Sequence, residues 1–476
     1  MAGPIPIVFP PSSAPGVRPQ ESGGRLVNAF SEKTLVGAPS DIIIRRSPGL
    51  QRVAMTTDPV HIHTRGFLDA GSVALWILNQ RVYKVDSDFV LTDLGALTGT
   101  KPVTTARNNA VTKQNVVVTE NGCFNLFDNS APTAFADADL PSSPTSVCDY
   151  DGYFVWSFGD GRVFASDLND VTVSALSFNT EQGLFARRVI RYAGRLYVFG
   201  DKWTGVYRDV GTSPFPFVRE ATVPRGIIGT HAVAGWEAGW ANELIWAGDD
   251  FNVYRLNGYT PVPISTDAVS RDIQRTVLTG DRDFIEAYVY MFGRNAFWVL
   301  SAHDEWTWEY NLATGEWNER KSHNRNCWKG MGSLRMFDQW LIGDEYTGEL
   351  YAISGDYFLE GTDQLIWFVE SGVLAGFPRG MIVPRASFHI TSGVGTYDLS
   401  ADPKVQISWS LDGGYTYGDP VLRRLGGPGS TKSHPYVLNC GLSRGQGIRF
   451  RLQVSDPVHV GLNGGVIEPK PGGYSG

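Results

Sequence analysis

The chain has 476 residues, 42% hydrophobic and 19% charged, so it can bury large cores and we expect two or more domains. It contains 54 glycines and 27 prolines beside 14 Trp, 19 Tyr and 25 Phe residues, which favours short strands joined by tight turns and excludes a helical bundle. No apolar run has the roughly 18 residues of a spanning helix, and the N-terminus lacks the features of a signal peptide. Four widely spaced cysteines indicate reduced thiols. We therefore expect a soluble protein, synthesised in a cytoplasm and not exported by the Sec route.

Acidic residues are concentrated in the middle of the chain. Residues 1–60 contain 6 Lys or Arg and 4 Asp or Glu, residues 61–376 contain 25 and 39, and residues 377–476 contain 10 and 6. The net charges of +2, −14 and +4 make up the total of −8. Proteins that grip nucleic acid present clustered Lys and Arg to its phosphates. The charge therefore argues against a DNA-gripping middle region, but not against DNA that passes nearby.

Residues 1–60 are expected to form an extended N-terminal arm followed by the first strands. Six prolines lie among the first 24 residues, and proline favours extended backbone over a packed domain. We expect this arm to be ordered only where a neighbouring subunit or another protein receives it. An apolar strand at residues 42–44 comes next, and Pro48-Gly49 predicts a sharp type II turn.

Residues 61–376 contain a recurring hairpin pattern, in which two short aromatic and aliphatic strands flank a turn rich in Gly, Asn or Asp. Seven such hairpins start at Ser72, Asn115, Gly152, Gly194, Asn242, Asn295 and Asp338. Their mean spacing is about 44 residues, the length of a four-stranded propeller blade. We predict an all-β fold with a seven-bladed β-propeller, and six blades as the main alternative. Unrelated hairpins stacked in a sandwich are the second alternative.

Two further segments complete the predicted organisation. Residues 265–267 (STD) can cap one helix, in which Val269, Ile273 and Val277 recur every four positions. Residues 377–476 contain longer alternating strands, such as 405–410 and 448–454, and predict a C-terminal β-sandwich. The glycine- and proline-rich tail beyond Gly461 is expected to be extended or mobile.

No catalytic, cofactor-binding or metal-binding residues are assigned. The chain lacks the G-x-S-x-G elbow of many serine hydrolases. His61 and His63 lie on the same side of a strand and could chelate zinc, but no carboxylate or thiol stands at a ligand spacing. His323 with Cys327 is a weaker pair still. We therefore expect no enzyme activity and no cofactor.

Two loops resemble ligand-binding motifs only in part. Residues 426–433 (GGPGSTKS) are similar to a phosphate-binding loop, but Thr431 stands where glycine is needed and no helix pattern follows, so a hairpin loop is expected. Residues 149–152 (DYDG) begin like a calcium loop, but Phe154 replaces the required glycine and Asp160 the required glutamate. A simple turn is expected there.

Residues 410–417 (SLDGGYTY) match the Asp-box pattern S-x-D-x-G-x-T-aromatic, which pins a hairpin turn on sialidase propellers without taking part in catalysis. The motif occurs once, outside the predicted blades, and keeps a sialidase-like or glycan-binding propeller as the alternative function. A crowd of aromatic residues could line a sugar site, but blade cores use such residues more often. They are Trp298, Trp306, Trp308, Tyr310, Trp317, Trp328 and Trp340. Residues 310–317 are expected to close a blade as strand, turn and strand.

The chain resembles, over most of its length, the tail accessory or packaged-DNA stabilisation proteins of short-tailed phages such as those infecting Salmonella. The likeness rests on the order of short segments: residues 46–50 (RSPGL), 225–230 (RGIIGT), 263–265 (PIS), 410–417, 447–452 (GIRFRL) and 457–458 (PV). The proline-rich start is longer than in that family and the tail richer in glycine, so the contacts of both ends do not carry over.

The resemblance implies a structural virion protein rather than an enzyme. Such proteins form a homohexameric nozzle that extends the DNA channel below the portal and its adaptor ring. The implied partners are other copies of the chain, the portal or adaptor, a tail needle or plug, and tailspikes or fibres, with DNA passing through without sequence-specific binding. The expected location is the virion tail, after synthesis in the bacterial cytoplasm. The sequence does not indicate which residues line the channel.

Overall fold

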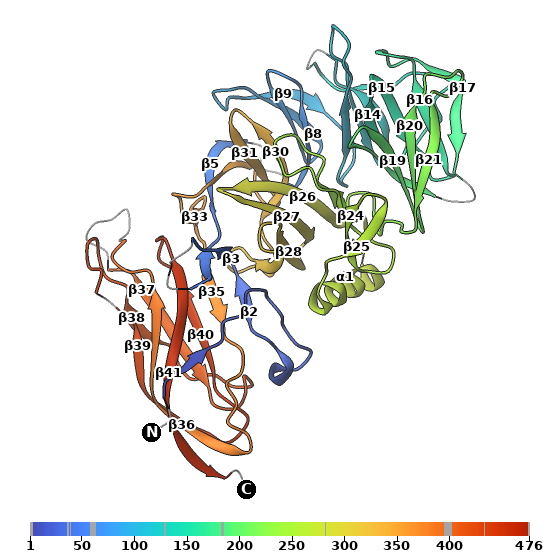
Figure 1. Ribbon diagram of the computed structural model, residues 1–476. Coiled ribbons are helices and arrows are strands. Elements are labelled where there is room, and N and C mark those ends of the chain that lie inside the picture. The colour runs from blue at the N-terminus through green and yellow to red at the C-terminus, as the bar shows by residue number, and fades with distance from the viewer. Residues whose placement is uncertain are drawn as a thin grey trace.

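The computed structural model describes residues 3–35, 38, 40–57, 63–127, 130–181, 185–280, 282–394, 402–432 and 434–474. Over these residues the protein is all-β, with one α-helix, α1 (Asp267–Thr279), and short 3-10 turns. Figure 1 shows repeated small sheets in blue, green and yellow, and a separate group of longer, mainly orange and red strands, near which both termini lie. The all-β prediction is confirmed.

Seven units of four antiparallel strands occur in the described residues, six of them built from consecutive strands. The six are β6–β9 (Thr64–Asp69, Ala74–Leu78, Arg81–Val85, Leu91–Ala96), β10–β13 (Thr104–Arg107, Asn115–Thr119, Gly122–Asn125, Thr133–Ala134), β14–β17 (Ser146–Tyr150, Tyr153–Ser157, Arg162–Ser166, Val173–Thr180), β18–β21 (Ala186–Tyr192, Arg195–Gly200, Thr204–Asp209, Phe217–Val223), β22–β25 (Val233–Ala234, Ile245–Ala247, Val253–Asn257, Thr260–Pro263) and β26–β29 (Ile285–Phe292, Asn295–Ala302, Trp306–Asn311, Glu316–Arg320). The seventh combines β30–β32 (Gly330–Met336, Gln339–Asp344, Glu349–Ser354) with β5 (Gly49–Met55) from the N-terminal part of the chain.

Each hairpin expected from the sequence forms the second and third strands of one unit. The turns that precede these hairpins show why the local sequence was enough to predict where each hairpin begins. Between β14 and β15, Asp151 and Gly152 have φ values of +48° and +92°, as a two-residue type I′ turn requires. Asp and Gly tolerate that region far better than branched residues, so the turn residues fix where each strand starts.

For six of the seven neighbouring pairs of units, the first strands lie next to one another. β6 contacts β10, β10 contacts β14, β14 contacts β18, β22 contacts β26, and β26 contacts β30. β30 in turn contacts β6, so the seventh unit lies beside the first. The unit formed by β30–β32 receives its fourth strand from β5, which pairs antiparallel with β32. An N-terminal strand therefore completes the unit that comes last along the chain.

The C-terminal part is a sandwich of two sheets around a shared core. One sheet has the order β3-β4-β41-β36-β39, with β1 also on β41. The other contains β2-β35-β40-β37-β38. Their bounds are β1 (Ile5–Ile7), β2 (Arg25–Val27), β3 (Ala29–Lys33), β4 (Ile42–Arg46), β35 (Trp367–Glu370), β36 (Arg379–Ile390), β37 (Lys404–Ser410), β38 (Val421–Arg424), β39 (Tyr436–Ser443), β40 (Arg449–Val454) and β41 (Gly461–Tyr474). Phe450, Leu452 and Val454 face the core, as the alternation predicts.

The N-terminal arm is not free in the single chain. β1 pairs with β41, and the chain then crosses towards the repeated units, where the backbone N–H of Ser13 donates to the carbonyl of Trp317 at 2.6 Å. A 3-10 turn at Pro19–Glu21 follows, and Arg449 donates to the carbonyl of Pro19 at 2.8 Å. The expectation that the arm is ordered only by another protein is wrong, because its backbone groups find partners in this chain's own sandwich and sixth unit.

The three-part division at residues 60 and 376 also differs from the structure. β2 pairs with β29 on one side and β35 on the other, so one nine-stranded sheet runs from the sixth unit into the sandwich. β35 lies before residue 377, yet it belongs to the sandwich. The glycine-rich tail, expected to be extended or mobile, forms the extended strand β41 in the middle of a sheet. Sequence boundaries miss these pairings because the partners are hundreds of residues apart.

Pro48-Gly49 forms no type II turn. Gly49 is instead the first residue of β5 and pairs with Ser354, so the two residues carry the chain from the sandwich sheet containing β4 to the seventh unit. A side chain at Gly49 has no room, because an added Cβ would lie 1.9 Å from the carbonyl oxygen of Tyr357 and 2.6 Å from that of Leu359. Glycine is needed here because the backbones of residues 357 and 359 pass close to it, not because the chain turns. Two short strands, β33 (Leu359–Glu360) and β34 (Asp363–Gln364), extend this sheet beyond β5.

The predicted helix is confirmed. Thr266 caps α1 by accepting a hydrogen bond from the backbone N–H of Val269, and Val269 and Ile273 are buried. Within the described residues, no helix is both long and apolar enough to cross a bilayer.

We predict that Gly49→Ala lowers the free energy of unfolding by about 2–4 kcal/mol, because two backbone carbonyls must move to admit the methyl group. Urea denaturation of the full chain measures the change. Gly427→Ala is the matched control, since an added Cβ there meets nothing within 4 Å. Equal stability of the two variants would contradict the packing of β5 described above.

Candidate functional site

The Asp-box residues form a pinned turn at the end of β37. The hydroxyl of Ser410 donates to Oδ1 of Asp412 at 2.6 Å, and the backbone N–H groups of Tyr415 and Thr416 donate to the same oxygen at 3.0 Å. The turn lies in the sandwich, outside the seven units. It therefore shapes a loop, in agreement with its non-catalytic role on sialidase propellers.

These hydrogen bonds set the ionisation of Asp412. Partial burial works against the charged form, but the donors from Ser410, Thr416 and Tyr415 outweigh it and lower the pKa of Asp412 to about 2. The carboxylate is thus ionised at all but strongly acidic pH.

The two loops that resemble ligand-binding motifs have structural roles. Asp149 lies on β14, where its Oδ2 accepts a hydrogen bond from Arg191 at 2.6 Å, and Asp151 and Gly152 form the hairpin turn. Residues 426–432 connect β38 to β39, and Ser433 lies outside the described residues. Because these strands belong to different sheets, the segment is a crossover rather than the hairpin loop expected from the sequence.

The aromatic crowd is core. Trp298, Trp308, Trp317 and Trp328 are at most 2% exposed, and all seven aromatic residues belong to one cluster built mainly from the β22–β25, β26–β29 and β30–β32 units. Residues 310–317 close their unit as expected, with β28 leading into β29. No described aromatic residue of this group is presented for sugar stacking.

The structure describes only one of the two residue pairs weighed in the sequence, His323 with Cys327. His61 lies outside the described residues. His323 is exposed, whereas Cys327 is buried with its Sγ 3.1 Å from the hydroxyl of Tyr346. Burial raises the pKa of the Cys327 thiol, which keeps it protonated and unreactive.

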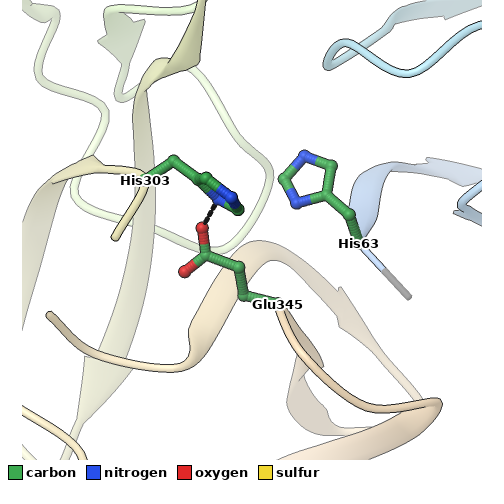
Figure 2. Close-up of side chains that lie close together, drawn as sticks. All are labelled: His63, His303 and Glu345. Carbon is green, nitrogen blue, oxygen red and sulfur yellow. Dashed lines mark ion pairs between the residues drawn. The ribbon is translucent and has the colours of Figure 1, made fainter. Parts of the chain in front are cut away.

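A different cluster includes His63. Figure 2 shows the imidazoles of His63 and His303 facing one another, with the Glu345 carboxylate reaching His303 from a third element. One ligand atom from each residue lies within 4.8 Å of the other two. Nδ1 of His303 contacts Oε1 of Glu345, and the centroids of the two imidazole rings are 5.2 Å apart.

Three units position these side chains. His63 immediately precedes β6, His303 follows β27, and Glu345 follows β31. The backbone N–H of Glu345 donates to the carbonyl of Lys329 at 2.8 Å, and the carbonyl of His63 accepts from Asn79 at 2.8 Å. The backbone at these two positions is thus fixed by neighbouring strands rather than by the cluster itself.

Burial controls the charge of the two histidines. It lowers the pKa of His63 to about 3, with further contributions from His303 and Arg65, and it also lowers the pKa of His303. The Glu345 side chain is fully buried, whereas that of His303 is 34% exposed. The cluster therefore presents imidazole nitrogens and a carboxylate at a partly open position.

The fold and its sites together define an all-β protein of repeated four-stranded sheets with an added sandwich. The family described as "Bacteriophage P22 Gp10, beta-propeller" matches residues 26–357, and the chain therefore belongs to this phage stabilisation family. The repeated units are accordingly those of a β-propeller, and the protein is a structural protein of a phage virion. This confirms the resemblance seen in the sequence at the level of the family.

Other comparisons add little. No curated protein matches the chain. Among solved structures, the computationally designed Ika8 protein is similar over 64% of this chain and 99% of its own, with 11% sequence identity and a TM-score of 0.38. A likeness this weak supports no conclusion.

We predict that Asp412→Asn lowers the thermal unfolding midpoint at pH 7, because the neutral amide is a weaker acceptor for the donors around it. Since the folded-state pKa is lowered, the stabilisation is fully present above the unfolded-state value of about 4 and is lost as the pH falls towards about 2. The difference between wild type and variant should shrink over that window. Asp419→Asn, which alters an exposed carboxylate nearby, is the control. A difference that does not vary with pH would contradict this assignment.

Proposed function

We propose that this chain forms the tail nozzle of a short-tailed phage, extending and closing the portal DNA channel, retaining packaged DNA and conducting the genome during ejection. The observation that carries the proposal is the match of residues 26–357 to a phage stabilisation family. In this proposal the chain acts as a homohexamer that binds the portal or adaptor ring, a needle or plug, and tailspikes or fibres. It has no enzyme activity and needs no cofactor.

The distribution of charge supports a conduit for DNA. Residues 61–376 carry a net charge of −14, and six copies around a channel would create a strongly negative field. Such a field repels phosphates and keeps contacts weak, so DNA can slide. The same field would disfavour any role that requires tight DNA binding.

The propeller is proposed to have seven blades closed by β5. The seven four-stranded units, the contact of β30 with β6 and the pairing of β5 with β32 support this count and closure. Closing a ring with a strand from the other end of the sequence covers the open edge of the last blade.

The outer face of the sandwich sheet supports attachment through the C-terminal part. Ile382 on β36, Leu438 and Leu442 on β39 and Val466 on β41 are all exposed, between 39% and 52%. Ile382 and Leu442 are direct neighbours across the two strands. Clustered apolar side chains on a sheet face are typical of protein–protein contacts, so we assign this face to attachment of the nozzle to the portal or adaptor ring.

We predict that particles of the encoding phage assembled without this chain lose their DNA, as measured by nuclease-accessible genome per particle. Wild-type chain and Val111→Asp supplied in trans should restore DNA retention, whereas Leu442→Asp should not, because it places a charge on the proposed contact face. Val111 is a fully exposed position in the propeller and serves as the control. Electron microscopy of the same particles reports whether nozzles are present. Particles that keep their DNA without the chain would refute the proposed function.

The alternative is a glycan-binding or sialidase-like propeller protein, which the Asp-box turn favours. Incubation of the purified chain with sialosides and host polysaccharides, together with electron microscopy of the protein alone, distinguishes the two. A ring or tube without turnover supports the nozzle. A monomer whose turnover is abolished by one Asp or Glu substitution supports the alternative.

A further inference from the structure

Several buried polar atoms in the cluster of His63, His303 and Glu345 have no hydrogen-bond partner. Both ring nitrogens of His63 and Oε2 of Glu345 are buried without a hydrogen-bond partner among the described residues. Buried polar atoms in folded proteins nearly always have one. Nδ1 of His303 and Oε1 of Glu345 contact each other, but neither makes a regular hydrogen bond among the described residues.

We propose that these three residues bind one divalent transition-metal ion of the zinc class. Two imidazole nitrogens and one carboxylate oxygen are a donor set that zinc favours, whereas calcium and magnesium require more oxygen ligands. A single ion placed between the side chains would satisfy a nitrogen of His63 and the Glu345 carboxylate together. The partial exposure of His303 leaves room for a water molecule as the fourth ligand.

The geometry needs only small side-chain movements. With bonds of about 2.1 Å, tetrahedral ligand atoms lie about 3.4 Å apart, and the three atoms here are already within 4.8 Å of one another. An ion between them would separate Nδ1 of His303 from Oε1 of Glu345, which are in direct contact, and bring His63 closer, both by rotation of side chains.

A further carboxylate lies where a metal-bound histidine needs it. Nδ1 of His303 faces the cluster, and Nε2 on the other side of the ring lies 3.5 Å from Oδ2 of Asp304. A metal-bound imidazole usually donates its second N–H to such a carboxylate, which holds the ring in place and makes the bound nitrogen more basic. Asp304 is therefore a positioning residue for His303.

The ion would join units that are far apart in the sequence. His63 begins the β6–β9 unit, Glu345 belongs to the unit that contains β30, and β30 contacts β6. His303 comes from the unit before. A metal bond across this junction constrains the unfolded chain over long loops, so it would stabilise the propeller where its first and last units meet.

Metal binding by the full-length protein tests the proposal. The protein is stripped with a chelator, dialysed and titrated with Zn²⁺ or Co²⁺. We expect one ion per chain, a rise in the thermal midpoint with Zn²⁺, and Co²⁺ absorption bands of a tetrahedral nitrogen and oxygen site without thiolate charge transfer. His63→Ala and Glu345→Gln should each weaken binding at least about tenfold, whereas His323→Ala, which removes an exposed imidazole, should bind as the wild type does.

The wild-type titration decides the matter even if a variant fails to fold. Absence of stoichiometric Zn²⁺ and Co²⁺ binding overturns the proposal and leaves the cluster as a contact between His303 and Glu345 beside a second imidazole. Equal binding by wild type, Glu345→Gln and His63→Ala overturns it as well, since the ion would then lie elsewhere. A thiolate charge-transfer band would also contradict the assigned ligands.

Discussion

An edge strand exposes unpaired backbone N–H and C=O groups, and in this protein two such edges are covered by strands from the first 55 residues. β5 pairs with β32 and completes the seventh unit. β2 lies between β29 and β35 and joins the sixth unit to the sandwich in one sheet. The propeller and the sandwich consequently share their N-terminal strands, and neither corresponds to a continuous stretch of sequence.

Buried arginines reinforce this shared region. Arg46, at the end of β4, donates to the carbonyl of Val458 at 2.9 Å, and Arg449 donates to that of Ser371 at 2.9 Å. Arg320 lies 3.6 Å from Glu309 and 3.5 Å from Glu360, is fully buried, and donates to the carbonyl of Pro48 at 3.3 Å. Removing one of these side chains would leave buried carbonyls or charges without partners, which destabilises more than the bond itself contributes.

The sequence predicted correctly those features that depend on neighbouring residues. The seven hairpins, the Thr266 cap and the alternation in β40 follow from turn residues and side-chain periodicity within ten or so residues. The arm was predicted poorly because proline content says little about distant partners, such as Ile467, with which Ile5 pairs. The tail is extended as expected, but its glycine content did not indicate that it lies in the middle of a sheet. Pro48-Gly49 has the composition of a turn. Glycine is required at position 49 because the carbonyl oxygen of Tyr357 leaves no room for a side chain, and that contact is not visible in the local sequence.

The histidine cluster illustrates the same limit. His63 was noticed for its neighbour His61, whereas its partners in space are His303 and Glu345. The sequence did contain a signal. His303 and Glu345 each follow the second strand of their unit, and His63 precedes the first strand of its own. In an antiparallel unit, the end of the second strand and the start of the first strand lie at the same end. Aligning the repeats would place all three residues at one end of the propeller, but only the structure shows that their side chains converge.

The dependence of the propeller on β5 is tested most directly by amide hydrogen exchange of the full-length protein. If β5 is an integral strand of the seventh unit, peptides covering Gly49–Met55 should exchange as slowly as those covering β31 and β32, since their N–H groups open only when that unit unfolds. Exchange of β5 within seconds, at the rate of the exposed hairpin turns and with β31 and β32 still protected, would contradict the account.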